Sequence, residues 1–485
     1  MDIVEIDASY SIIVGAGVES FKDRWKSLIK GAYYDPLVKR GFKSPYRYFT
    51  KDANGKGVYA MNGHLIADSL VTPTGVKFEP NATKDLDLPF KPYDFQTNAI
   101  KTCLTNSRCL IKMCTGSGKS LVIALLAHIL VKSGYKGVLL VPNINLLEQF
   151  KSDIKSYNLD FLYDNLEILG GGSHATMQKP LLISTWQSLI NTDKRDYDFI
   201  IADECHRYSS DVTSEMITEL KCTKMRWGFT GTIPDEPEDR MMLEGLFGPV
   251  FNLVSARQLI DKGLGTPINI NALWLSYNAE VLNSLRAPYQ TALKFIKAYE
   301  PRNDLISSLA IKLLNKQQNT LVLYSHTEHG KSLYRNIVNR MHPDIKLTNA
   351  NIVGPKSYDF QRELNIYFIN GEDDAKTREM TRIALNNSSG SILVANYAVL
   401  STGINIKALH NLIMASPLKS YTTITQSIGR GIRLHDSKSK FNVYDIIDNT
   451  NIRGFGGSFV RQYRHRLNTS YQPEGYNVVD CHVNI

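Results

Sequence analysis

The stretch MCTGSGKS, residues 113–120, has the residue types and spacing of a phosphate-binding loop. Glycines let backbone N–H groups curl around phosphate oxygens, and a following helix adds the partial positive charge of its N-terminus. We expect Lys119 to reach the β- and γ-phosphates of ATP and Ser120 to bind Mg²⁺. The predicted nucleotide-binding residues of the loop are Thr115, Gly116, Ser117, Gly118, Lys119 and Ser120. Met113 stands where this pattern has its first glycine, so a glycine turn that caps a core helix is the alternative.

A second candidate site for chemistry is YDFIIADECH, residues 197–206, where an apolar run leads directly into Asp203 and Glu204. At a strand end that faces a phosphate-binding loop, one carboxylate can hold Mg²⁺ through water, and its neighbour can position and deprotonate the attacking water. We assign the first role to Asp203 and the second to Glu204. An acidic helix N-terminus and a separate metal site are the alternatives, which the preceding strand and the lack of neighbouring ligands disfavour.

Two further features complete the candidate ATP site. RWGFTGTIP, residues 226–234, is an expected strand that ends in Thr230 and Thr232, whose hydroxyls suit the sensing of phosphate. Gln96 lies about one helix before the loop, where its amide could read the edge of adenine. Alone, the first feature would be an ordinary turn and the second a surface glutamine.

The elements around these residues predict an α/β fold. CLIKMC, residues 109–114, is typical of a buried strand, and LVIALLAHILV, residues 121–131, has helical periodicity. GVLLVPN and LLISTWQ repeat the strand-then-polar design and end in Pro142, Asn143, Thr185 and Gln187. The carboxyl ends of parallel strands form the rim at which open α/β sheets bind ligands. We therefore expect these four residues on a ligand-binding rim.

Length and composition narrow the class of protein. A chain of 485 residues is too long for one core, so we expect two or three domains. The formal charge of +9 favours a polyanionic partner, although a mildly basic surface can also serve solubility. The six cysteines form no C-x-x-C pair, which fits reduced thiols. An acidic N-terminus and the lack of a long apolar run predict a soluble cytoplasmic protein with no membrane partner.

Residues 1–88 are expected to form a separate small α+β module. Strand-like stretches (DIVEIDASYSIIV, GVYAMN and GHLIADSL) surround one helical stretch, VESFKDRWKSLIKGAYY. Residues 22–51 interleave lysines and arginines with aromatic residues, a mixture that suits a nucleic-acid surface. A solvated face over an ordinary aromatic core gives the same pattern.

MCTGSGKS, DECH and TGT, in this order after a glutamine-containing lead-in, resemble motifs Q, I, II and III of superfamily 2 helicases and translocases. The resemblance implies a second RecA-like domain. Its motif IV would be TLVLYSH with Ser325, and its motif V the loop with Thr402, Gly403 and Asn405. Family members use motif V to touch both nucleic acid and nucleotide, so Gly403 and Asn405 join the predicted nucleotide site. Nucleic-acid contacts are then predicted at Pro142, Asn143, Thr185, Gln187, Ser325 and Thr402.

QSIGRGIR, residues 426–433, resembles motif VI. The resemblance makes Gln426, Arg430 and Arg433 catalytic residues, with the two arginines reaching the γ-phosphate across a cleft. Alone, an Arg-x-x-Arg spacing would be a solvated helix face. We divide the chain into the N-terminal module 1–88, motor domains 89–265 and 266–455, and a tail 456–485, with a less patterned connector at about residues 256–305.

Departures from the family patterns favour DNA as the track. DEAD-box RNA helicases would show Asp-Glu-Ala-Asp and Ser-Ala-Thr where this chain has DECH and TGT. The compact layout, with local matches such as GGGSHA at residues 170–175, is similar to UvsW-like phage helicases and their RecG-like functional relatives. That resemblance implies ATP- and Mg²⁺-dependent remodelling of branched DNA, with single-stranded and duplex DNA also bound, by a monomer.

Three alternatives stay open at this point. One is an RNA helicase, and another is the motor subunit of a restriction-type system. The third is a nucleic-acid-binding ATP switch with little turnover, which Glu204, Arg430 and Arg433 argue against. Residues 348–359 are a candidate strand-separating wedge, although a tolerated surface insertion would look the same.

Overall fold

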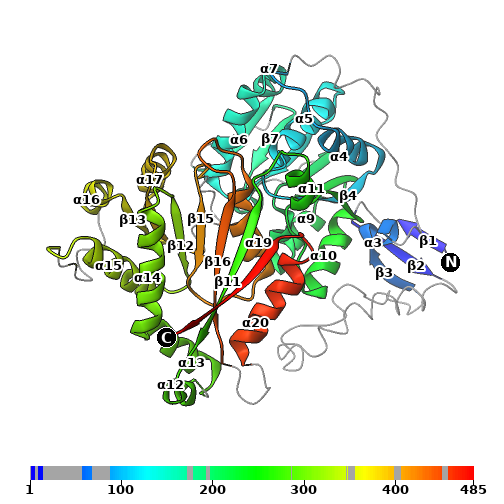
Figure 1. Ribbon diagram of the computed structural model, residues 1–485. Helices are drawn as coiled ribbons and strands as arrows, with labels where there is room; N and C mark the ends of the chain where they lie inside the picture. The colour runs from blue at the N-terminus through cyan, green and yellow to red at the C-terminus, as the bar shows by residue number, and fades with distance from the viewer. Residues whose placement is uncertain are drawn as a thin grey trace. The chain divides into compact units, whose positions relative to one another are not determined.

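The computed structural model describes eleven stretches of the chain: residues 2–5, 9–14, 57–67, 88–171, 178–192, 197–285, 287–345, 347, 356–397, 406–450 and 457–485. They divide into two compact units, Met1–Val254 and Ser255–Ile485 (Figure 1). Several predicted features lie outside the described residues. These are the helical and basic-aromatic stretch within residues 18–51, residues 172–175 of GGGSHA, Thr402, Gly403 and Asn405 of motif V, and residues 348–355 of the wedge.

The first unit is built on a seven-stranded sheet in which every neighbouring pair is parallel. Its order is β10 (Val250–Val254), β4 (Arg108–Met113), β9 (Met225–Thr230), β8 (Phe199–Ala202), β5 (Gly137–Leu140), β7 (Leu181–Ser184) and β6 (Leu166–Leu169). Strands β5, β7 and β8 are buried along their whole length, as expected for parallel strands covered on both faces.

Helix α4 (Asp94–Thr105) precedes the sheet. The helices between its strands are α5 (Lys119–Lys132), α6 (Ile144–Ser156), α7 (Asp160–Asp164), α8 (Trp186–Leu189), α9 (Asp211–Thr218) and α10 (Pro237–Phe247). Helix α5 is buried along residues 121–131 without a break. A continuously buried helix therefore follows the phosphate-binding loop and fixes it to the core.

A three-stranded antiparallel sheet lies before this fold in the chain, with β2 (Tyr10–Val14) between β1 (Asp2–Glu5) and β3 (Gly57–Met61). The prediction of a strand at GHLIADSL is wrong, because Asn62–Ala67 form helix α3. Tertiary packing decides this: a Cβ on Gly63 would lie 2.2 Å from the carbonyl oxygen of Glu244. His64 Nε2 lies 2.8 Å from Met241 O. The helix thus packs backbone to backbone against α10. That residues 1–88 form a domain of their own stays a prediction.

The second unit has another seven-stranded parallel sheet. Its order is β13 (Ile366–Ile369), β14 (Ile392–Asn396), β12 (Thr320–Tyr324), β15 (Asn411–Met414), β16 (Phe441–Asp448), β11 (Ile268–Ser276) and β17 (Asn477–Asn484). Two parallel sheets with connecting helices confirm the predicted α/β class with two RecA-like domains.

The sheet of the second unit starts earlier and ends later than the sequence indicated. Strand β11 lies in the stretch interpreted as a connector, and β17 lies in the tail. In β11, Ile268, Ile270 and Ala272 are buried while Asn269 and Asn271 are only partly buried. Such alternation is typical of a strand near a sheet edge and is weaker than the continuous apolar runs of central strands.

Helices of the second unit are α11 (Ala256–Asp261), α12 (Ala279–Ser284), α13 (Tyr289–Ala298), α14 (Glu300–Leu314), α15 (Thr327–Met341), α16 (Lys356–Leu364), α17 (Ala375–Asn387), α19 (Tyr421–Gly429) and α20 (Ser458–Arg466). A π-helical turn, η5 (Leu467–Tyr471), follows α20. No helix in the described part of the chain is both long and apolar enough to cross a bilayer.

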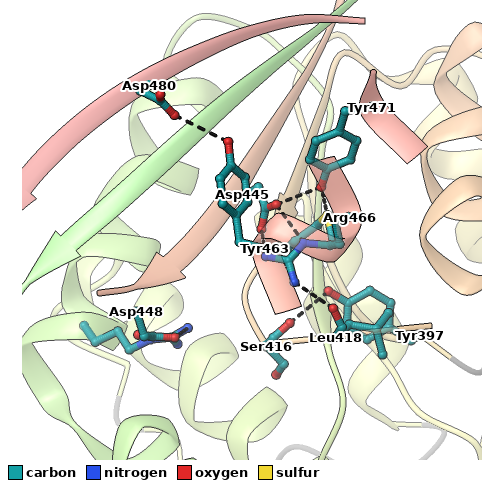
Figure 2. A network of polar contacts seen from close by, with 11 residues as sticks. Tyr397, Ser416, Leu418, Asp445, Asp448, Tyr463, Arg466, Tyr471 and Asp480 are labelled. Atoms are coloured by element: carbon teal, nitrogen blue, oxygen red, sulfur yellow. Dashed lines mark hydrogen bonds and ion pairs between the residues drawn. The ribbon is translucent and has the colours of Figure 1, made fainter. Parts of the chain in front are cut away.

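Two buried ion pairs hold the helices of this unit to its sheet. Arg466 of α20 donates from Nε and Nη2 to the two carboxylate oxygens of Asp445 on β16, at 2.9 Å each (Figure 2). The Tyr471 hydroxyl donates to the same carboxylate at 2.7 Å. Arg302 of α14 makes an equivalent pair with Asp448. Both arginines are buried, and both of their partners lie on β16.

His128 in the middle of α5 gives the first unit an acid-sensitive core. Its side chain is 4% exposed, neither ring nitrogen has a hydrogen-bond partner among the described residues, and its ring lies edge-on to Phe161. Burial, helped by the charge of Lys132, lowers the pKa of His128 from 6.5 to about 4. The folded unit therefore holds a neutral ring that the unfolded chain would protonate.

We predict that His128→Leu flattens the acid side of the stability profile. Above pH 6.5 the ring is neutral in both states; as the pH falls towards 4, only the unfolded state gains the proton, so stability is lost. Between pH 6.5 and about pH 5, the wild-type protein should lose about 2 kcal/mol of unfolding free energy at this residue, and the variant should lose none. Urea unfolding at both pH values measures it. A difference between the proteins that does not change with pH would contradict the prediction.

Candidate active site

The phosphate-binding loop joins β4 to α5 and takes a shape that glycine makes possible. Gly116 and Gly118 have φ angles of +86° and +80°, the left-handed region in which a side chain is strained. Ser117 ties the loop down, because its backbone N–H and its hydroxyl both donate to Cys114 O, at 3.2 and 2.7 Å. Thr115 and Ser120 lie half-buried on either side of this turn. The loop thus lies at the N-terminus of a buried helix, the arrangement that phosphate binding requires.

Gln96 of α4 lies against this loop. Its side-chain Nε2 donates to Ser117 O at 2.9 Å, and its Oε1 accepts from Tyr93 N at 2.9 Å. A Cβ on Gly118 would lie 2.4 Å from the same Nε2, so the close approach itself needs glycine. Gln96 therefore supports the loop directly; its contact with adenine stays a prediction.

Lys119 and the two carboxylates of DECH meet beside the loop. Lys119 Nζ donates to Glu204 Oε1 at 2.8 Å, and Glu204 N donates to Asp203 Oδ1 at 2.9 Å. Burial alone would raise the pKa of Glu204, but the charge of Lys119 and the nearby His206 outweigh it and hold the pKa well below its ordinary value. Burial and the charge of Glu204 raise the pKa of Asp203. Glu204 is therefore held in its ionised form at neutral pH.

The backbone at Glu204 is strained. Its φ angle is +47°, in the left-handed region that residues other than glycine rarely adopt. Such conformations cost about 1–3 kcal/mol and are found at functional sites where the surrounding structure imposes them. Its Oε2 accepts no hydrogen bond from the described residues although it is buried. One carboxylate oxygen is thus paired with Lys119, and the other faces His206 Nδ1 at 3.3 Å.

His206 and Thr230 link this carboxylate to the TGT stretch. His206 Nδ1 lies 2.9 Å from Thr230 Oγ1 and 3.3 Å from Glu204 Oε2. The Thr230 hydroxyl donates to Thr232 O at 2.8 Å, so His206 Nδ1 must carry the proton in its own contact with Thr230. The histidine of DECH therefore joins the catalytic carboxylate to the strand end that follows β9, a role that the sequence analysis did not assign.

Gly231 brings the TGT turn against the loop itself. A Cβ at this position would lie 3.5 Å from Thr115 Oγ1 and 3.7 Å from Lys119 Nζ. Three stretches that are far apart in the sequence therefore surround one ammonium group. The side-chain oxygen of Thr232 is buried without a hydrogen-bond partner among the described residues, which leaves it available to a ligand.

The oxygen donors at this site fit Mg²⁺. Magnesium prefers carboxylate and hydroxyl oxygens and keeps several of its waters. Asp203 Oδ2 accepts no hydrogen bond from the described residues, and Ser120 presents a hydroxyl in the first turn of α5. These two residues would hold the ion, which would screen phosphate charge and polarise the transferred phosphoryl group. The described residues contain no group of three or more His, Cys, Asp or Glu side chains suited to a different metal.

The rim residues lie at the carboxyl ends of paired strands, as predicted. Leu140 of β5 is opposite Ser184 of β7, so Pro142 and Asn143 follow one strand where Thr185 follows its neighbour. Asn143 and Thr185 cap α6 and α8 through their side-chain oxygens, and Gln187 is exposed. The amide nitrogen Nδ2 of Asn143 has no hydrogen-bond partner in the described residues. Their contacts with nucleic acid stay predictions.

The predicted residues of the second unit are placed on its own elements. Ser325 follows β12, and its backbone N–H donates to Ser416 Oγ at 3.2 Å. Gln426 lies on α19, Arg430 starts the 3-10 turn η4 (Arg430–Ile432), and Arg433 follows that turn. A Cβ on Gly431 would lie 2.2 Å from the Phe441 ring, so the two arginines are carried by a turn that packs directly on β16. Their reach to the γ-phosphate stays a prediction.

Comparisons with known proteins agree with this site. The family model described as "Type III restriction enzyme, res subunit" matches residues 89–235, which include the loop, DECH and TGT. The chain is 31% identical over 385 residues to the ATP-dependent DNA helicase UvsW of Enterobacteria phage T4, covering 77% of this chain and 72% of the relative. It is 27% identical over 248 residues to a DNA 3'-5' translocase of Sulfurisphaera tokodaii, covering 50% of this chain and 52% of that protein.

A solved structure shares the fold. The ATP-dependent Type ISP restriction-modification enzyme LlaBIII bound to DNA is similar at a TM-score of 0.58 and 17% identity, over 82% of this chain and 32% of that one. At this identity the likeness shows the two-unit α/β architecture alone. The sequence relatives confirm the resemblance that the ordered motifs indicated.

Proposed function

The chain belongs to the superfamily 2 helicases, in the family of the ATP-dependent DNA helicase UvsW of phage T4, and on this premise we propose that it remodels branched DNA. The enzyme is an ATP-dependent DNA helicase. The observation that carries the chemistry is the group of Lys119, Glu204 and His206 beside the loop, in which one oxygen of Glu204 is paired with Lys119 and the other lies near His206.

Each residue at the ATP site has a proposed part in hydrolysis. Loop N–H groups and Lys119 bind the β- and γ-phosphates, and Ser120 and Asp203 hold Mg²⁺. Glu204 orients and deprotonates the attacking water, and His206 with Thr230 keeps the carboxylate in place. Ionised at neutral pH, Glu204 is in the state that a general base needs.

Motif VI supplies the remaining charge in this proposal. Arg430 and Arg433 stabilise the negative charge that develops on the γ-phosphoryl group, and Gln426 helps to place the nucleotide. The closing of the two units on ATP and their opening after hydrolysis would move one unit along bound DNA. Support for this comes from the ordered motifs and from the relatives, whose names describe a DNA helicase and a DNA translocase.

The proposed substrates are four-way junctions, forks and displaced-strand loops, processed by a monomer. ATP hydrolysis measured with no nucleic acid, single-stranded RNA, single-stranded DNA, duplex DNA and a four-way DNA junction tests this, with Lys119→Ala as the inactive control. We expect the greatest stimulation by the junction, together with its conversion into separate arms. Stimulation by duplex DNA alone would instead indicate a duplex translocase like the motors of restriction systems, and stimulation by RNA alone would contradict the proposal.

A further inference from the structure

The second unit contains a cavity of about 950 Å³ that is lined mostly by residues outside the helicase motifs. It lies among α13, α14 and α15, next to the carboxyl end of β12. Helix α13 comes from the stretch that the sequence analysis interpreted as a connector. The lining of the cavity includes Lys294 and Lys297 from α13, Asn303 from α14, His326 at the start of α15, and Arg335 within α15.

Lys297 is the unusual group in this cavity. Its side chain is only 9% exposed, and its Nζ lies 2.6 Å from His326 Nδ1. No carboxylate of the described residues lies within ion-pair distance of it. Burial, together with the charge of Arg302, lowers the pKa of Lys297 to about 8. The ammonium group is therefore partly buried beside a neutral imidazole on the cavity lining, where an anionic ligand would stabilise it.

The carboxylates around the cavity do not supply that charge. Glu328 is paired with Lys331 at 3.0 Å, and Asp304 is paired with Arg340 at 2.6 Å. The third, Glu300, is exposed at the start of α14. Lys294 adds positive charge to the same lining. The cavity is thus suited to an anion.

A hydrogen-bonded network fixes the floor of the cavity. Asn303 Nδ2 donates to Lys297 O at 2.8 Å, and Asn303 Oδ1 lies 3.0 Å from His329 Nε2. The amide oxygen can only accept, so His329 Nε2 carries the proton and Nδ1 accepts from Ser416 Oγ at 3.1 Å. Burial and the charge of Arg302 hold the pKa of His329 well below its ordinary value, so the ring stays neutral.

The same network reaches the residue that resembles motif IV. Ser416 Oγ accepts from Ser325 N at 3.2 Å, and the Ser325 hydroxyl lies 2.9 Å from His326 Nδ1. Lys297 and Ser325 therefore meet at one imidazole ring. A group that contacts the predicted nucleic-acid residue would also be near the buried ammonium.

We propose that Lys297, with His326 beside it, binds a backbone phosphate of the DNA on which the enzyme acts. The inference rests on the proposed function, because it takes DNA as the polyanion. A lysine ammonium binds phosphate as a point charge. Because the cavity is already formed, few side chains have to be ordered when the ligand binds. Lys297 would then be a DNA-binding residue outside the helicase motifs.

The test compares DNA binding by wild type, Lys297→Met and Lys297→Arg. The matched control is Lys316→Met, which removes the same charge from an exposed lysine in the turn before β12, whereas the cavity lies beyond the carboxyl end of that strand. We expect Lys297→Met to weaken binding about tenfold and to reduce the salt dependence by about one released counterion. Lys297→Arg should keep most of the affinity, and Lys316→Met all of it. Matching melting temperatures exclude unfolding as the cause.

A pH series separates a phosphate contact from a purely structural role. Between about pH 7 and 9.5, wild-type affinity should fall as Lys297 loses its proton, whereas the Arg and Met variants should show no such step. Other titratable or charged groups around Lys297 are common to all three proteins: Lys294 on α13, Glu300, Arg302 and Asp304 on α14, and His326, Glu328, His329 and Arg335 at or on α15. The comparison therefore isolates Lys297.

The outcomes are distinguishable. If wild type binds DNA and Lys297→Met matches Lys316→Met, the inference is wrong and the proposed function stands. If wild type binds no DNA, both fail. Titration with inorganic phosphate and with AMP completes the test. If Lys297→Met abolishes binding of either molecule but leaves DNA affinity unchanged, the cavity binds a free phosphorylated molecule and the proposal is wrong.

Discussion

Glu204→Gln is expected to lower kcat for ATP hydrolysis by about 10²–10⁴-fold, the usual contribution of a positioned general base. Glutamine keeps the size and the hydrogen-bonding oxygen of the side chain but cannot take a proton from water. Lys119, Ser120 and the loop backbone are unchanged, so ATP binding should be retained. The variant should also still bind DNA, because the predicted DNA contacts lie on other elements.

Steady-state hydrolysis with saturating DNA, together with binding of a fluorescent ATP analogue, checks this expectation. Glu215→Gln is the matched control, since Glu215 is exposed on α9 in the same unit. Its turnover should equal that of wild type. Unchanged turnover in Glu204→Gln would remove Glu204 from the role of base, and loss of ATP binding would show that its pairing with Lys119 shapes the loop instead.

Asp445→Ala is expected to destabilise the second unit by about 3–5 kcal/mol, because it leaves the Arg466 guanidinium buried without its counter-charge. Both side chains are 2% exposed, and the Tyr471 hydroxyl loses its acceptor as well (Figure 2). The Asp445→Ala/Arg466→Met pair should recover much of the loss, since it removes the isolated charge. Helix α20 and η5, which this network holds on β16, should exchange amide hydrogens faster in Asp445→Ala.

Urea unfolding and hydrogen exchange measure the two effects. Arg382→Met is the surface control: its pair with Glu379 is partly exposed, and such pairs contribute about 0–1 kcal/mol. A loss in Asp445→Ala no larger than this control would mean that the carboxylate is dispensable. A double variant as unstable as Asp445→Ala would show that volume, and not the isolated charge, is responsible.

Local sequence patterns determined most of the first unit. The phosphate-binding loop is contiguous, so its glycines, Lys119 and Ser120 could be read directly, and the expected strands and helices around it match β4 and α5. The strand before Asp203 and Glu204 was predictable for the same reason, because a continuous apolar run is typical of a parallel strand that is buried on both faces. The α/β class and the helicase family follow from these ordered stretches.

Only the tertiary structure decided which side chains meet. The Lys119–Glu204 contact spans 85 residues, and the contacts of His206 with Thr230 and of Gly231 with the loop also join separate stretches. Packing against α10 made α3 a helix, and pairing with β16 and β17 made β11 a strand, although both sequences are locally ambiguous. The sequence did not indicate Lys297 as a binding residue, because its burial and its lack of a counter-charge result from the packing of three helices. Sequence periodicity indicates the secondary structure that each segment prefers locally. These features depend instead on the free energy of packing and hydrogen bonding between elements.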